Sequence, residues 1–179
     1  MLSEEKIISG CIEGQGDCQK ALYDLYSGKM FALCIRYAKH KAEAEDILQE
    51  GFIKVFDKID TFRGDGSFEG WIRRIMIHTA IKYYHKASRQ NESLGWETLP
   101  DSPLRPEVYG QLDADQIMEM IQELPKGYRL VFNLYSLEGY KHKEIADMLD
   151  IGESTSRSQL TKARAMLQEM IGKMYSLVL

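Results

Sequence analysis

Three of the chain's four prolines, Pro100, Pro103 and Pro106, lie within a single short stretch that shows no helical period. Proline removes a backbone donor and interrupts helices, so this stretch predicts a linker rather than part of a folded core. Because the residues on both sides have regular apolar patterns, we expect the 179-residue chain to have three parts: a domain over 1–88, a linker over 89–113 and a domain over 114–179.

Apolar residues on both sides of the linker recur at the spacing of an α-helix. Leu48, Phe52 and Val55 follow one another at i, i+4 and i+7, and the alternation typical of a β-strand is absent. The fold class is therefore predicted to be all-α, with two small helical domains. Helices are expected over 43–59, 68–86, 125–137, 142–149 and 154–170, and helical spacing also recurs from Leu22 to Leu33 and from Ile117 to Leu124.

The composition, with 44% apolar and 28% charged residues, is typical of a globular chain. No apolar run approaches the roughly 18 residues of a membrane span, and no leader pattern follows Met1, so we expect a cytoplasmic protein without membrane insertion. Cys11, Cys18 and Cys34 form no CxxC pair. They are interpreted as free thiols packed like small apolar side chains, and not as a zinc site.

The sequence contains no catalytic signature. Residues 64–66 lack the GxxxxGK[ST] pattern of a phosphate-binding loop, and His142 begins no HExxH motif of a zinc hydrolase. We therefore expect a protein that is not an enzyme and that uses no cofactor, metal ion or small-molecule substrate.

The formal net charge of -4, from 23 basic and 27 acidic side chains, does not by itself indicate nucleic-acid binding. The distribution of charge is more informative, because residues 70–90 contain basic side chains and no Asp or Glu. A locally positive segment of this kind can attract phosphates even on a mildly acidic protein.

One narrow face of the helix in this segment carries Trp71, Arg74, His78, Lys82 and His85. An aromatic ring can stack on an unpaired base while cations contact phosphates, so the face suits single-stranded or opened DNA. The alternative is a solvated basic face with Trp71 in the core.

The helix expected over 43–59 has a second distinctive face, opposite its apolar side. Asp46, Glu50 and Ile53 follow one another there at i, i+4 and i+7, with Gln49 beside them. Acidic residues around an exposed apolar side chain indicate an interface with a basic protein partner, although the acids could instead only solvate the surface.

The last two predicted helices and the turn containing Gly152 have the order of a helix-turn-helix, in which the second helix enters the major groove of DNA. Small polar and basic side chains suit hydrogen bonds to base edges and phosphates. The same pattern also fits an ordinary amphipathic helix with a solvated face. The outward residues of the second helix are Ser154, Ser158, Thr161, Lys162 and Ala165, flanked by Arg157 and Arg164.

Together these segments resemble an extracytoplasmic-function sigma factor, a small class of the bacterial sigma-70 family that has only regions 2 and 4. Residues 44–56 (AEDILQEGFIKVF) resemble the helix that binds core RNA polymerase, and residues 62–75 resemble the -10 promoter segment. Motifs within 124–164 resemble the helix-turn-helix that reads the -35 element. The resemblance implies a promoter-specificity factor that initiates transcription.

The resemblance also implies roles for individual residues. Core polymerase would contact Asp46, Gln49, Glu50, Ile53 and Lys54. A flipped base and the opened -10 element would contact Phe62, Arg63, Asp65, Ser67, Phe68, Trp71, Arg74, His78 and Lys82. The -35 duplex would contact Lys141, Lys143, Ser154, Thr155, Arg157, Ser158, Gln159, Thr161, Lys162 and Arg164.

The implied partners are core RNA polymerase, promoter DNA and an anti-sigma factor. The chain has His78 where many family members have Asn, so we expect an altered base preference at -10 that would depend on pH if the imidazole titrates. A stand-alone helix-turn-helix regulator, with a sensing or dimerising N-terminal domain, is the alternative. Such a regulator would not need the acidic face around Ile53 or the basic face around Trp71.

Overall fold

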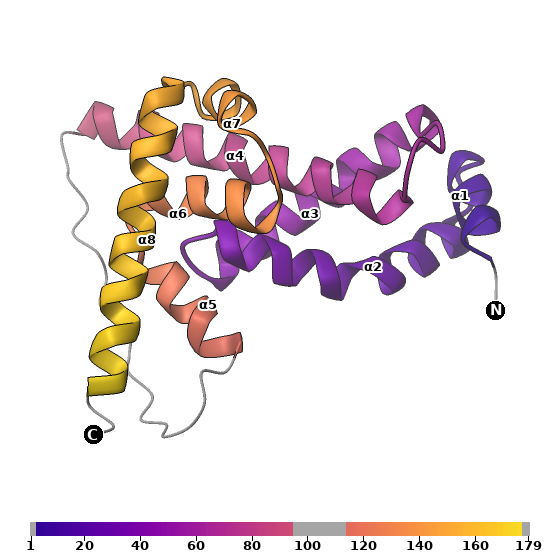
Figure 1. The fold of residues 1–179 in the computed structure, drawn as a ribbon. Coiled ribbons are helices and arrows are strands. Elements are labelled where there is room, and N and C mark those ends of the chain that lie inside the picture. The colour runs from indigo at the N-terminus through magenta and orange to yellow at the C-terminus, as the bar shows by residue number, and fades with distance from the viewer. Residues whose placement is uncertain (1–2, 95–113, 177–179) are drawn as a thin grey trace. The chain divides into compact units, whose positions relative to one another are not determined.

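The computed structural model of the chain describes residues 3–94 and 114–176 (Figure 1). Every regular element in these two ranges is helical, which confirms the predicted all-α class. The chain divides into two compact units, Met1–Ala87 and Ser88–Leu179, and each is described by itself. Within the described residues, no helix is both long and apolar enough to cross a membrane.

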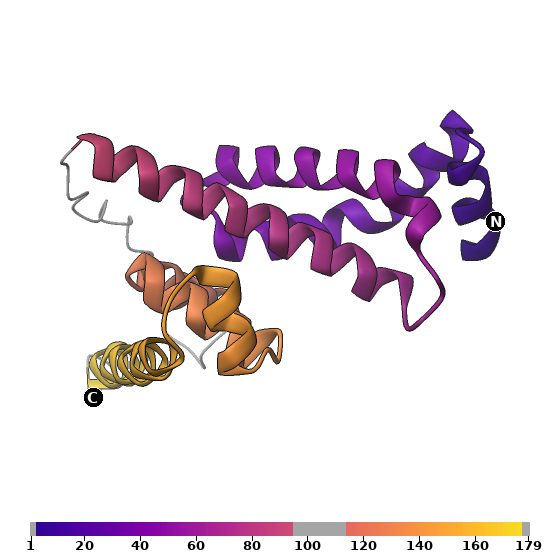
Figure 2. The same cartoon turned by 90° about the horizontal axis from the view of Figure 1, so that it is seen from above.

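The first unit is built around three long helices. Its elements are α1 (Glu4–Ile12), α2 (Gly16–Tyr37), α3 (Lys41–Lys58), the 3-10 turn η1 (Ile59–Thr61) and α4 (Phe68–Leu94), and Figure 2 shows α3 and α4 running side by side. Leu22 and Met30 from α2, Ile47 from α3, and Ile72 and Met76 from α4 are almost fully buried. Each such side chain stabilises the fold by about 1.5–3 kcal/mol.

The first helix is not among those expected from apolar periodicity. Ser3 caps α1, since its Oγ accepts a hydrogen bond from the backbone N–H of Lys6 at 3.4 Å. Glu4 and Glu5 follow in the first turn, where acidic side chains interact favourably with the helix dipole. This Ser-Glu-Glu start is the signal that could have located the helix.

The three cysteines are free and buried, as expected for thiols that pack like small apolar side chains. Cys34 has no exposed surface, and burial raises the pKa of its thiol to about 12. Burial, followed by the neighbouring Cys18, also raises the pKa of Cys11.

The fourth helix extends beyond the expected boundary. It continues to Leu94, so residues 89–94 of the predicted linker are helical. Residues 88–94 include no Gly or Pro, and the Arg, Gln, Glu and Leu among them favour a helix. The rest of the predicted linker, 95–113, lies outside the described residues.

The second unit contains α5 (Ala114–Glu123), α6 (Lys126–Phe132), the π-helical turn η2 (Asn133–Leu137), α7 (His142–Leu149) and α8 (Glu153–Ser176). Ile121 and Leu124 pack against Ala163 and Leu167, so α5 and the predicted apolar side of α8 share one core. The aromatic and methionine residues around this core are Met118, Met120, Tyr128, Phe132, Met166 and Met170.

The helix expected over 125–137 ends differently from a regular α-helix. The N–H of Glu138 donates to the carbonyl of Asn133 at 3.0 Å, a bond across five residues that marks the π-helical turn. Gly139 then adopts a φ of 79°, and the N–H of Tyr140 donates to Leu134 O at 2.9 Å. A glycine in this left-handed region commonly follows the end of a helix, and the sequence predicts this stop at Gly139.

Candidate functional site

A pocket of about 290 Å³ lies between the loop after η1 and the start of α4. Its volume is close to the lower end of the range for small-molecule sites, about 300–1,000 Å³. It is lined by Thr61, Phe62, Arg63, Asp65, Gly66, Ser67, Gly70, Trp71 and Arg74. Of the residues predicted for the -10 element, the structure therefore brings six together; Thr61, Gly66 and Gly70 are additions.

Local interactions hold this loop in shape. The Ser67 Oγ accepts a hydrogen bond from the N–H of Gly70 at 3.1 Å, which caps the start of α4. Gly64 and Gly66 have φ angles of 78° and 104°, in the region that glycine adopts without steric cost. The loop thus changes direction between η1 and α4 while Arg63 and Asp65 remain exposed.

Phe68 differs from the expectation that it contacts DNA, because its side chain is only 2% exposed. Its ring stacks on Trp71 with centroids 5.5 Å apart and meets the edge of Phe62 at 5.0 Å. A wholly apolar ring lowers the free energy of the fold more when it is buried than when it is exposed at the rim of the pocket. Phe68 therefore supports Trp71, which is half-buried and lines the pocket.

The predicted basic face of α4 is exposed only in part, since Trp71 and His85 are half-buried. Arg74, His78 and Lys82 reach solvent, whereas Met76 and Ala80 are buried on the opposite side. Partial burial, and then the positive charge of Lys58, lower the pKa of His78 below its ordinary value. The imidazole is therefore neutral at neutral pH, with one nitrogen that donates and one that accepts.

The predicted protein-binding face of α3 is present in part. Asp46 and Gln49 are exposed, and Ile53 keeps 60% of its surface accessible. Glu50 and Lys54 are half-buried and turn towards α4, so they differ from the expected fully exposed stripe. The helical period predicts Asp46, Gln49, Glu50 and Ile53 near one face, and only the resemblance adds Lys54. Neither gives information on contacts made across to another helix.

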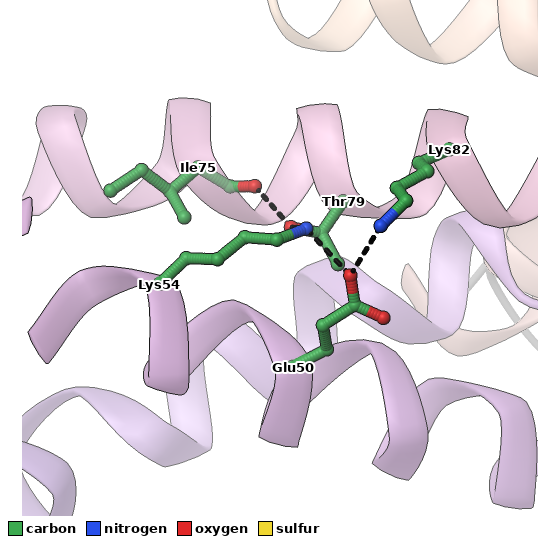
Figure 3. Close-up of polar contacts among 5 residues, drawn as sticks. All are labelled: Glu50, Lys54, Ile75, Thr79 and Lys82. Carbon is green, nitrogen blue, oxygen red and sulfur yellow. Dashed lines mark hydrogen bonds and ion pairs between the residues drawn. The ribbon is translucent and has the colours of Figure 1, made fainter. Parts of the chain in front are cut away.

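A polar network joins α3 to α4 at this point (Figure 3). Lys54 Nζ lies 2.7 Å from Glu50 Oε1 and donates to Thr79 Oγ1 at 3.0 Å. Lys82 Nζ lies 3.3 Å from the same Glu50 oxygen. Hydrogen bonds from Lys54 and, more weakly, from Lys82 lower the pKa of Glu50 despite its partial burial, so its carboxylate is ionised at neutral pH.

The helix-turn-helix has the predicted boundaries at α7 and begins α8 within one residue of expectation. Asp150 adopts a φ of 54° and, with the N–H of Ile151 donating to Ala146 O at 3.1 Å, ends α7 before the turn to α8. The exposed residues predicted to face the -35 duplex are Lys141, Lys143, Ser154, Thr155, Arg157, Ser158, Thr161, Lys162 and Arg164.

Gln159 differs from the other predicted residues of α8 because it is half-buried. Its amide group lies over Gly127, whose missing side chain leaves room for it, and a β-carbon built there would be 3.4 Å from Gln159 Nε2 and Oε1. The Oε1 atom is buried. Gln159 therefore packs between α8 and α6 and does not extend into solvent as Ser158 does.

Two tyrosines support the basic residues of α8. Lys162 Nζ lies 6.0 Å from the ring centre of Tyr128, and the Arg164 guanidinium lies 5.7 Å from that of Tyr135. These are cation–π distances. The sequence predicts no role for either tyrosine, because their pairing with α8 depends on contacts between helices that no local pattern indicates.

Each unit by itself has features of a binding surface. Exposed cations border a pocket in the first unit and cover one face of α8 in the second. In α8, the Ser158 hydroxyl donates to Thr155 O at 3.0 Å and the Thr161 hydroxyl donates to Arg157 O at 3.1 Å. Both hydroxyl oxygens therefore keep lone pairs with which to accept hydrogen bonds from a ligand.

Comparison with known families identifies both units. The model of Sigma-70 region 2 matches residues 22–90, and that of Sigma-70 region 4 matches residues 114–167. The chain is 27% identical over 183 residues to an ECF RNA polymerase sigma-E factor of Haemophilus influenzae, covering 95% of this chain and 96% of that protein. It is 29% identical over 169 residues to an RNA polymerase sigma-H factor of Pseudomonas aeruginosa, covering 85% and 87% respectively.

A solved structure shares the fold. It is the sigma factor RpoE in complex with the anti-sigma factor NepR from Bartonella quintana, with a TM-score of 0.57 and 22% sequence identity. The likeness covers 86% of this chain and 96% of the Bartonella chain.

Proposed function

The chain belongs to the extracytoplasmic-function sigma factors of the sigma-70 family, which are promoter-specificity factors of RNA polymerase, and from this we propose which partner each of its surfaces binds. The first unit binds core polymerase through α3 and the opened -10 element through α4 and the preceding loop. The second unit binds the -35 duplex through α8. The observation that carries the proposal is the 290 Å³ pocket at the start of the basic face of α4.

The pocket holds a base flipped out of the non-template strand. Trp71 offers an aromatic surface at the wall, and Arg63 and Arg74 offer positive charge at the rim. Stacking on an aromatic side chain contributes about 1–3 kcal/mol per base, which offsets the few kcal/mol needed to unstack that base. His78 and Lys82 continue the contact along the strand.

Core polymerase binds the exposed part of the α3 face. Ile53 is the apolar centre of this surface, and Asp46 and Gln49 supply polar contacts around it. An apolar centre with a polar rim is the usual composition of a protein interface. Because Glu50 and Lys54 also contact α4, their part in core binding differs from that of the three exposed residues.

The -35 duplex lies against the exposed side of α8. Ser158 and Thr161 face base edges, and Arg157, Lys162 and Arg164 reach bases or phosphates. Gln159 acts through packing on Gly127 rather than through the groove. Lys141 and Lys143, at the start of α7, approach the DNA backbone.

An anti-sigma factor is a further proposed partner, since the Bartonella sigma factor was solved with one bound. The chain acts in the cytoplasm, where RNA polymerase and promoter DNA are found. It supplies specificity to the polymerase and catalyses no reaction itself. A stand-alone regulator is not favoured, because the region 2 match extends through α3 and most of α4, which such a protein does not need.

The test is transcription with purified core polymerase on genomic DNA, followed by mapping of the start sites. The wild-type chain should bind core and direct initiation at specific promoters. Asp46→Lys and Ile53→Asp should each abolish core binding without unfolding the chain, whereas Asp24→Lys, on the exposed side of α2, should not. Specific duplex binding by the chain alone, without binding to core, would contradict the proposal.

A further inference from the structure

The Trp71 ring at the wall of the pocket belongs to a cluster of four aromatic rings. Phe68 stacks on Trp71 with centroids 5.5 Å apart and an interplanar angle of 17°, and Phe62 lies 5.7 Å from Trp71. The fourth ring, Tyr26 of α2, meets the edge of Phe68 at 5.8 Å and does not itself line the pocket. Stacked and edge-on pairs of this kind are favourable, so the position of each ring depends on that of its neighbour.

Tyr26 is held at its far end by the first helix of the chain. Its hydroxyl donates a hydrogen bond to the carboxylate of Glu4 on α1. Burial, and then this hydrogen bond, raise the pKa of the hydroxyl above its ordinary value, so the hydroxyl stays protonated and remains a donor. Because only 4% of Tyr26 is exposed, water has little access to replace Glu4 as its partner. The hydrogen bond therefore fixes the tilt of the ring against Phe68.

A second contact joins α2 to the start of α4 close to this point. Lys29 Nζ lies 2.7 Å from Glu69 Oε2, less than one turn after Tyr26 and one residue after Phe68. These two side chains are 62% and 34% exposed, and an exposed ion pair contributes little to stability. A hydrogen bond from a buried hydroxyl to a carboxylate is stronger, so the pairing of Tyr26 with Glu4 is the main polar anchor of the cluster.

We propose that Tyr26 is a positioning residue for the base-binding pocket and that Glu4 holds it in place, and this rests on the function proposed above. Tyr26 fixes Phe68, and Phe68 fixes the plane of the Trp71 ring on which the flipped base stacks. Without the hydrogen bond, the Tyr26 ring tilts and Trp71 samples more orientations. The base then stacks less well, whereas contacts between cations and phosphates are unchanged. The region 2 match begins at residue 22, so α1 acts on the pocket from outside that match.

The first arm of the test uses the free, full-length chain and needs no DNA. Trp96→Phe in every protein leaves Trp71 as the one tryptophan of the chain. Tyr26→Phe keeps the ring but removes the donor, and Glu4→Ala removes the acceptor. Each should raise the rate at which acrylamide quenches the fluorescence of Trp71, and the double variant should show no further rise.

Two matched variants of α1 separate the hydrogen bond from the charge of the helix. Glu4→Gln keeps an oxygen that can accept from Tyr26 and should restore quenching to near the wild-type rate. Glu5→Ala removes the same charge from the same turn and should leave quenching unchanged. Wild-type quenching in Tyr26→Phe and Glu4→Ala, or an equal rise in Glu5→Ala, would overturn the proposal.

The second arm measures binding of fluorescein-labelled single strands by holoenzyme assembled from core polymerase and each variant. The strands carry the -10 sequence of a mapped promoter, intact or with one abasic site. The wild type identifies the stacked base as the position whose removal weakens binding most. Tyr26→Phe should weaken binding of the intact strand by about two- to five-fold, a part of the full stacking contribution, and should not weaken binding of the strand that lacks this base.

The two strands distinguish a positioning role from a general loss of structure. No loss on the intact strand, or an equal loss on both strands, would overturn the role of Tyr26, because only the intact strand can stack on Trp71. Failure of the wild-type holoenzyme to distinguish any abasic strand from the intact one would instead contradict the proposed function of the pocket.

Discussion

The Nδ1 atom of His142 lies 2.9 Å from the Oγ of Ser156, which joins the first residue of α7 to the first turn of α8. Ser156 is fully buried, so its hydroxyl has no access to water as an alternative partner. The contact fixes one helix of the helix-turn-helix against the other, and thereby the direction in which the exposed face of α8 points.

Replacing this buried hydroxyl should loosen the helix-turn-helix. Ser156→Ala leaves the facing nitrogen of His142 without its partner, at an expected cost of about 1–2 kcal/mol. Hydrogen exchange of the α7 and α8 amides, measured by mass spectrometry, should become faster than in Ser136→Ala, which alters an exposed serine of the same unit. Equal protection in the two variants would contradict a stabilising role.

Two glycines on long helices should respond oppositely to alanine. A β-carbon on Gly51 would lie 2.9 Å from Met76 Cε and closer still to its sulfur, in a fully buried contact between α3 and α4. Overpacking costs about 1–3 kcal/mol, whereas the higher helix propensity of alanine returns up to about 1 kcal/mol. We expect Gly51→Ala to lower the urea midpoint of the first unit.

Gly28 provides the matched case. A β-carbon there would meet nothing within 4 Å, so Gly28→Ala on α2 should raise the same midpoint through helix propensity alone. A Gly51→Ala protein as stable as Gly28→Ala would show that Met76 moves aside without cost.

The ion pairs of Glu50 should stabilise the first unit only while its carboxylate is charged. Hydrogen bonds from Lys54 and Lys82 lower its pKa in the folded state, so the stabilisation is complete above the unfolded pKa and is lost as pH falls through the folded pKa. Glu50→Gln should therefore lower the free energy of unfolding at pH 7, by less than about 1 kcal/mol, but not in strong acid. A difference in urea denaturation that is the same at both pH values would contradict the ionic origin.

The cation–π contact of Arg164 should contribute to -35 binding. Tyr135→Leu removes the ring 5.7 Å from the guanidinium, whereas Tyr135→Phe keeps an aromatic face there. We expect the leucine variant to weaken binding of the mapped -35 duplex by about two- to five-fold and the phenylalanine variant to retain it. The difference should disappear in an Arg164→Gln background, and its persistence there would assign the effect to the stacking of Tyr135 on His142.

Much of the helical architecture and part of the site could be predicted from local patterns. The spacing of apolar residues places Ile53 and Lys162 on exposed faces and Met76 and Leu160 on buried ones, as the structure confirms. The turn over 150–152 is predicted from Gly152 between two helical patterns, and Asp150 has the φ of 54° that ends α7 there. Such features depend on residues within one or two turns of each other, where the 3.6-residue period determines the geometry.

The C-terminal end of α4 could not be predicted from local patterns. The prolines predict a linker at their own positions, which lie outside the described residues, but they do not mark where the preceding helix ends. That helix continues to Leu94. Helix ends depend on a balance between propensity and capping that changes gradually along a segment without Gly or Pro.

The sequence by itself determined the main helices, the faces they expose and the order of the two units, because these follow from short-range periodicity and turn chemistry. Only the tertiary structure decided that Phe68 is buried and that Gln159 packs on Gly127. It also decided that Glu50 reaches Lys82, a residue 32 positions away. Contacts of this kind form when separate helices pack, and the balance between burial and hydrogen bonding at each contact is set by the partner helix rather than by local sequence.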